Sequence, residues 1–160
     1  MRGPNASWVI WLTLFVALVL YVLPIPLNWR WYRPELPMLV LFYWSLALPH
    51  RVGIISAALV GLGLDLLDGA AVGALALGMA MSNLSVLLSY QRIRQFDGLQ
   101  QSVVVGLLVA LSLMIERWLQ NLVGIGASGF GFLCPVPMSI LLWVPVRNAL
   151  RIVRRYYEVA

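Results

Sequence analysis

The stretch GLGLDLLDGAAVG, residues 61–73, places Asp65 and Asp68 inside a long apolar region that is rich in glycine. A carboxylate is costly where water cannot reach it, and glycine is a poor helix former. A chain that keeps both residue types here needs them for its fold or for its function. Which of the two applies depends on the medium that surrounds the stretch.

The composition of the chain indicates that this medium is lipid. The 160 residues are 62% hydrophobic and only 11% charged, whereas soluble domains carry a charge on roughly 25% of their residues. So few charges cannot cover the surface of a soluble protein. We therefore expect an all-α integral membrane protein that forms one polytopic membrane domain over residues 1–160. Cys134 is the only cysteine, which excludes an intramolecular disulfide.

Six apolar segments are candidates for membrane-spanning helices, which need about 20 apolar residues each. We expect these helices near residues 7–23, 35–48, 52–67, 70–90, 99–119 and 130–150. The second and third, at about 21–24 Å, are shorter than the hydrocarbon core of about 30 Å. Either both are anchored at their ends, or one of them enters the membrane without crossing it.

The distribution of the arginines predicts the orientation of these helices. With both termini in the cytoplasm, eight arginines lie inside and three lie outside, as the positive-inside rule expects. The inner set is Arg2, Arg51, Arg92, Arg94, Arg147, Arg151, Arg154 and Arg155, and the outer set is Arg30, Arg33 and Arg117. This alternation requires a very short outer turn between the third and fourth helices, in the stretch quoted first.

Small residues predict that the third and fourth helices form a tight pair. Residues four apart share one helix face. On the third helix such a row is Ala57, Gly61 and Asp65, and on the fourth it is Ala70, Ala74, Gly78 and Ser82. Such faces allow two helix backbones to approach closely in a membrane. Gly69 suits the positive-φ position that ends a helix, and Gly73 continues the glycine series of the hairpin.

This hairpin predicts different roles for the two aspartates. Asp68 can accept hydrogen bonds from backbone amides at the start of the fourth helix, where the helix dipole also favours a negative charge. Asp65 must point into the bundle, where it meets a donor or is protonated. We favour a structural role for both, and a proton- or ion-linked site is the alternative.

Two other pairs of ionisable residues lie at predicted helix ends. His50 and Arg51 follow Pro49 at the inner interface, where we expect an anchor, with contact to a cytoplasmic partner or a lipid phosphate as the alternative. Glu116 and Arg117 point about 100° apart, so we expect each to bond a different group. Arg117 either ends its helix in the headgroup zone or donates to Asp65 or Asp68.

The C-terminal segment VRNALRIVRRYYEVA, residues 146–160, is predicted to be an amphipathic helix at the inner membrane surface. Four arginines fall within about 100° of one another on a helical projection: Arg147, Arg151, Arg154 and Arg155. We expect this face to bind anionic lipid, and docking of a cytoplasmic partner is a further hypothesis.

Several motifs in a fixed order resemble the rod shape-determining protein MreD family. The most specific is WSLALPHRVG, residues 44–53, followed by GLGLDLLDGAAVGALALG, residues 61–78, then YQRIRQF, residues 90–96, and LLWVP, residues 141–145. The resemblance covers nearly the whole chain. It implies a non-enzymatic bacterial inner-membrane protein of the cell-elongation machinery, which supports peptidoglycan synthesis and rod cell shape.

The resemblance also implies partners and a fold. The implied partners are MreC, the actin homologue MreB, the glycosyltransferase RodA and the elongation transpeptidase. MreC has one membrane helix and a periplasmic domain. No nucleic-acid partner is implied. The fold is similar to the six-helix substrate-binding components of energy-coupling-factor transporters. No catalytic residue, cofactor or metal is implied, and a lone histidine is not a metal site.

A small-molecule-binding subunit of a vitamin-type transporter is the alternative function. Such a subunit needs several convergent polar groups around a cavity. The polar side chains predicted at membrane depth are few: Asp65, Ser82, Asn83, Ser85 and Ser112.

Overall fold

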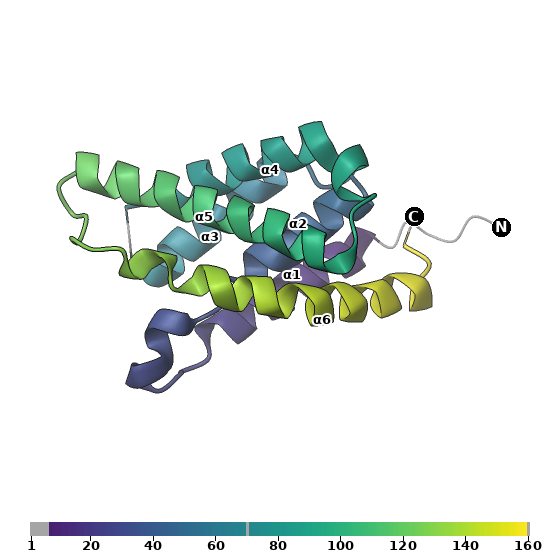
Figure 1. The fold of residues 1–160 in the computed structure, drawn as a ribbon, viewed down its shortest axis with the longest axis horizontal. Coiled ribbons are helices and arrows are strands. Elements are labelled where there is room, and N and C mark those ends of the chain that lie inside the picture. Colours follow the sequence, from purple (N-terminus) through teal and green to yellow (C-terminus); the bar gives the residue numbers. More distant parts are fainter. Residues whose placement is uncertain (1–6, 70, 160) are drawn as a thin grey trace.

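The computed structural model describes residues 7–69 and 71–159, and within these ranges every regular element is a helix (Figure 1). The α-helices are α1 (Ser7–Val22), α2 (Leu36–Ala47), α3 (Ile54–Asp68), α4 (Ala74–Ile93), α5 (Gly98–Leu122) and α6 (Pro135–Tyr156). Two short 3₁₀ helices, η1 (Leu27–Tyr32) and η2 (Gly131–Leu133), precede α2 and α6. The predicted six helices are therefore confirmed.

Helix α2 forms the centre of the bundle. All ten of its residues from Pro37 to Leu46 are buried, and α2 contacts α1, α4, α5 and α6. A helix that is apolar on every side is stable only when other elements surround it. Its 12 residues extend about 18 Å. This short length is tolerated because the neighbouring helices, rather than lipid, enclose α2.

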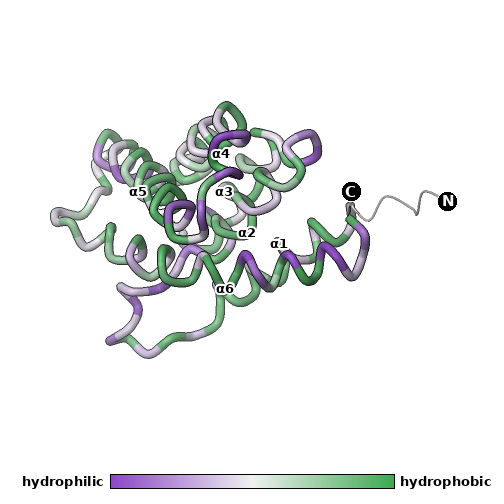
Figure 2. Tube along the Cα trace, turned by 45° about the vertical axis from the view of Figure 1, so that its right-hand side comes forward, coloured by the Kyte–Doolittle hydropathy of each residue, from purple (hydrophilic) through white to green (hydrophobic). Residues whose placement is uncertain are grey.

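Two segments of the described residues are long and apolar enough to cross a membrane by themselves. They are Gly98–Leu122, with 25 residues, and Gly131–Tyr156, with 26 residues. Helix α1 is apolar but shorter, at 16 residues. Figure 2 shows hydrophobic residues along most of the helices and hydrophilic residues recurring along the last part of α6.

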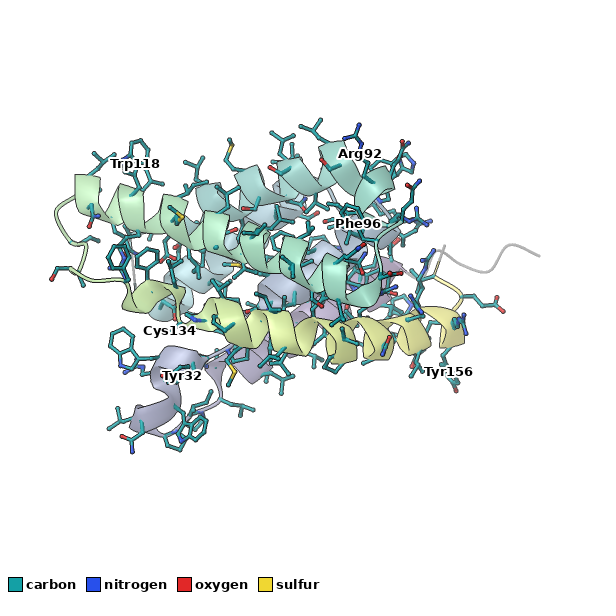
Figure 3. The ribbon with its side chains drawn as sticks, in the orientation of Figure 1. Tyr32, Arg92, Phe96, Trp118, Cys134 and Tyr156 are labelled. Carbon is teal, nitrogen blue, oxygen red and sulfur yellow. The ribbon has the colours of Figure 1, made fainter. Side chains whose placement is uncertain are left out.

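The helices run back and forth, so that the connections alternate between two ends of the bundle (Figure 1). Arg92, Phe96 and Tyr156 lie at one end, which we call the arginine end (Figure 3). Tyr32, Trp118 and Cys134 lie at the other end, which we call the aromatic end. The beginning of α1 and the end of α6 share the arginine end, which is the arrangement that the arginine distribution requires.

Glycine allows α4 to pack closely between α3 and α5. A Cβ atom added at Gly61 of α3 would lie 2.5 Å from the Cα of Ala76, and one added at Gly78 of α4 would lie 2.4 Å from the carbonyl oxygen of Ser112. Both neighbours are backbone atoms that no rotamer change can move. The predicted tight pair of helices is therefore confirmed, and α4 makes a second such contact with α5.

The end of α3 and the start of α4 differ in part from the prediction. Gly69 has a φ of +64° and caps α3, as predicted. Gly73 was predicted to belong to the packed series, but a Cβ there would meet no atom within 4 Å. Its φ of +97° instead shows that Gly73 turns the chain into α4, since other residues rarely adopt that conformation. Ala70, which the prediction placed on the packed face, lies outside the described residues.

Candidate functional site

The carboxylate of Asp65 caps the first turn of α4. Its Oδ2 accepts hydrogen bonds from the backbone N–H groups of Gly73 (2.9 Å) and Ala76 (3.2 Å), and its Oδ1 accepts one from Leu75 (3.1 Å). Asp65 is only 1% exposed. The first amides of a helix have no carbonyl partner within it, and its dipole favours a negative charge there. Asp65 therefore joins α3 to α4 as a buried acceptor, as predicted, and its donors are backbone amides.

Asp68 does not cap α4, and in this respect the prediction was wrong. Helix α4 begins at Ala74 rather than near residue 70, so its first amides reach Asp65, about one turn earlier in α3. The exposed Asp68 instead accepts a hydrogen bond at Oδ2 from the Tyr21 hydroxyl (2.8 Å). The guanidinium of Arg33 lies 4.1 Å above the ring of Tyr21. These contacts connect the ends of α1 and α3 with the segment before α2.

Glu35 is a buried carboxylate that the sequence analysis did not identify. It is 6% exposed, and its Oε2 accepts no hydrogen bond from the described residues. Its backbone N–H donates to the hydroxyl of Ser139 in α6 (3.4 Å). The signal was present in the sequence, because Glu35 stands between Pro34 and the apolar residues of α2. Pro34 also marks the start of a helix, where a charged side chain is expected to be exposed.

Glu116 and Arg117 bond different groups, as predicted. Glu116 Oε1 accepts a hydrogen bond from the side-chain amide of Gln120 (2.7 Å). Arg117 Nη1 donates to the carbonyl oxygen of Ala127 (3.4 Å), and its guanidinium lies 5.0 Å from the centre of the Phe132 ring. The hypothesis that Arg117 is the donor for Asp65 or Asp68 is therefore wrong. Arg117 instead holds the connection between α5 and α6.

The polar residues in the middle of the bundle bond to one another between helices. The hydroxyl groups of Ser82 in α4 and Ser112 in α5 are 2.7 Å apart. Asn83 accepts from the Ser45 hydroxyl of α2 (2.6 Å) and donates to the carbonyl oxygen of Gly53 before α3 (3.2 Å). These hydrogen bonds join α2, α4, α5 and the residue that precedes α3, and they satisfy groups that would be costly in lipid.

The remaining predicted residues lie at the arginine end. Arg51 donates to the hydroxyl of Ser7 at the start of α1, and His50 is exposed beside it in the connection between α2 and α3. Arg147 and Arg151 border a cavity with Tyr43 of α2. Among the described residues, no group of three or more His, Cys, Asp or Glu side chains could hold a metal ion.

Comparison with known proteins supports the resemblance found in the sequence. Residues 3–153 match the family model described as rod shape-determining protein MreD. A rod shape-determining protein MreD of Haemophilus influenzae is 32% identical over 162 residues, which cover 93% of this chain and 93% of that protein. No solved structure matches this chain.

Proposed function

Because this chain belongs to the MreD family of rod shape-determining proteins, we propose that it is a non-enzymatic scaffold subunit of the bacterial cell-elongation complex. Membership of the family supports a role in the determination of rod cell shape. In this proposal the chain crosses the inner membrane several times, binds MreC and supports peptidoglycan synthesis. MreB, RodA and the elongation transpeptidase are further proposed partners.

One observation carries this proposal: hydrogen bonds between helices occupy the polar groups in the middle of the bundle. Asp65 binds backbone amides of α4, Ser82 binds Ser112, and Asn83 binds Ser45. A site for a small solute needs polar groups that are free to converge on a ligand. Groups used in helix contacts stabilise one fixed arrangement, which favours a scaffold over a solute-binding transporter subunit. A likeness to the energy-coupling-factor components is therefore proposed for the six-helix fold only.

We propose that the membrane helix of MreC binds in the groove between α1 and α3. A cavity of about 230 Å³ lies there, and Trp11 of α1 and Ser56 of α3 are among the residues that line it. Trp11 is 49% exposed, and Ile55, which precedes Ser56, is 77% exposed. A groove flanked by apolar side chains fits an apolar helix, because helices in lipid associate by close packing.

Photo-crosslinking residues placed at Trp11 or at Ser56 should link the chain to MreC in membranes. A crosslinking residue at Leu107 of α5, which is 66% exposed on a different helix, is the matched control and should not form this product. Immunoblots for the tagged chain and for MreC report the crosslinked species. Equal crosslinking from all three positions would show that MreC does not occupy this groove, and failure of MreC to co-purify with the unmodified chain would contradict the scaffold proposal.

The proposed orientation predicts the location of reporters fused within the chain. Fusions after Arg33, Gly69 and Gly126 should report the periplasm, and fusions after Arg51, Phe96 and Ala160 should report the cytoplasm. The reason is the excess of arginine at one end of the bundle. Paired alkaline phosphatase and fluorescent protein fusions measure this directly. A fusion after Gly69 that reports the cytoplasm contradicts the proposed orientation of α3 and α4.

A further inference from the structure

A cavity of about 250 Å³ lies at the arginine end of the bundle, between α2, the connection from α4 to α5, and α6. Four arginines line it: Arg94, Arg147, Arg151 and Arg154. Arg94 follows α4, in the short segment between Arg92 and Phe96 that lies at the same end of the bundle as Tyr156 (Figure 3). Residues about 60 positions apart in the chain thus bring their positive charges to one cavity.

These arginines lack negative partners within the described part of the chain. Arg94, Arg147 and Arg151 make no hydrogen bond or ion pair with the described residues, and Arg154 donates to two neutral acceptors, the carbonyl oxygen of Val159 (3.3 Å) and the hydroxyl of Tyr43. No carboxylate is found among the described residues that line the cavity. Guanidinium groups that converge without a counter-charge repel one another, and an oxyanion between them removes this repulsion through charge-assisted hydrogen bonds.

The start of α5 lies beside Arg147. Arg147 Nη1 lies 3.5 Å from the position that a Cβ atom of Gly98 would occupy, and Gly98 is the first residue of α5. The N-terminal end of a helix carries a partial positive charge and favours anions. The N-cap residue of α5 is the exposed carboxylate Asp97, which offsets the partial positive charge of this helix end, so the arginines carry the case for an anion.

The floor of the cavity is apolar and rigidly held. Trp143 is 0% exposed and Tyr43 is 8% exposed, and Leu46 lies beside them in the lining. Trp143 Nε1 donates to Gln101 Oε1 (3.3 Å), and Gln101 Nε2 donates to the carbonyl oxygen of Ile93 (3.1 Å). The polar groups of the floor are therefore already paired. A cationic rim above an apolar floor fits an amphiphile whose polar part is a phosphate.

We propose that this cavity binds the phosphate group of an anionic phospholipid from the leaflet at the arginine end. A second cavity of about 290 Å³, lined by Arg151, Arg154, Arg155 and Val159, shares two arginines with the first and gives room for the rest of the headgroup. The inference rests on the proposed function only in placing this end at the membrane surface. It goes beyond general attraction of arginines to a membrane, because it assigns one bound lipid to one cavity.

Binding of a short-chain phosphatidylglycerol to the purified full chain in neutral detergent tests this inference. The dissociation constant, measured by calorimetry below the micelle concentration of the lipid, should rise about tenfold in Arg147→Gln, the effect of one lost charge-assisted contact. Arg92→Gln removes the same charge from an arginine outside the lining and should change the constant less than about twofold. Arg147→Lys keeps the charge but loses the planar guanidinium, so it should bind more tightly than Arg147→Gln and more weakly than the unmodified chain.

Two further binding measurements identify the source of the phosphate and test the specificity of the site. Inorganic phosphate should compete with the lipid only at about 100-fold higher concentration, because it makes no contact with the apolar floor, and short-chain phosphatidylcholine should bind at least tenfold more weakly. Equal losses in Arg147→Gln and Arg92→Gln overturn the proposal in favour of diffuse attraction. Inorganic phosphate that binds as tightly as the lipid overturns the lipid assignment. MreC is absent from this assay. A result that overturns the lipid proposal therefore leaves the scaffold proposal unaffected.

Discussion

Gly61→Leu should separate α3 from α4 and remove most of the folded protein from the membrane. Even the first carbon of the new side chain would lie 2.5 Å from the Cα and 2.9 Å from the backbone nitrogen of Ala76. Overpacking costs about 1–3 kcal/mol where side chains can adjust, and backbone atoms adjust less. A loss of about 3 kcal/mol corresponds to a fall in the unfolding temperature of roughly 6–12 °C for a chain of this size.

Gly63→Leu is the matched control for this substitution. Gly63 lies two residues further along α3, and a Cβ atom there would meet no atom within 4 Å. Leucine also favours a helix over glycine by about 0.8 kcal/mol, so Gly63→Leu should leave stability unchanged or raise it. Protein level in membranes and thermal unfolding in detergent measure both variants. Similar losses in the two variants would contradict the close contact of α3 with α4.

Asp65→Leu should destabilise the protein by at least about 3 kcal/mol, because three backbone amides lose their acceptor and each unpaired buried donor costs about 1–3 kcal/mol. Asp65→Asn should cost less. Its single carbonyl oxygen can take the place of Oδ2, which accepts from Gly73 and Ala76, and only the amide of Leu75 is then left without a partner. Thermal unfolding in detergent orders the variants, with the unmodified protein highest and the leucine variant lowest.

Asp68→Leu provides the comparison for a carboxylate in the same hairpin. It removes one hydrogen bond from Tyr21 at an exposed position and should cost about 1 kcal/mol. If Asp68→Leu lowered the stability of the protein as much as Asp65→Leu, the cap on α4 would not be the main contribution of Asp65.

The helices of the N-terminal half could be predicted closely from the sequence. Proline and glycine end these segments, and the ends of α1, α2 and α3 lie within two residues of the prediction. Helix α4 starts four residues late, because Gly73 turns the chain at a φ of +97°. Helix α6 starts at Pro135 because η2 precedes it. Apolar composition alone does not distinguish a glycine in a turn from a glycine at a contact, so both differences occur at glycine-rich connections.

Part of the candidate site depended on contacts that no sequence spacing contains. The burial of Asp65 could be predicted from its place on the face of α3 that carries small residues. Asp65 rather than Asp68 caps α4 because α4 starts later than predicted. Tyr21 comes from α1, 47 residues before Asp68. The arginine cavity likewise depends on Tyr43 and Trp143, for which no role was predicted from the sequence. Pairings between distant helices are set by the packing of the whole bundle.

Cell shape and MreC assembly in the Asp65→Asn strain test most directly the claim that this chain acts as a scaffold. Cells depleted of the native protein should remain rods when they produce Asp65→Asn, and tagged Asp65→Asn should co-purify with MreC, because asparagine keeps two of the three capping hydrogen bonds. Asparagine cannot carry a charge or exchange a proton at this position. Round cells in which Asp65→Asn accumulates and binds MreC normally would contradict the account, since they would show that the charge of Asp65 is needed for something other than assembly.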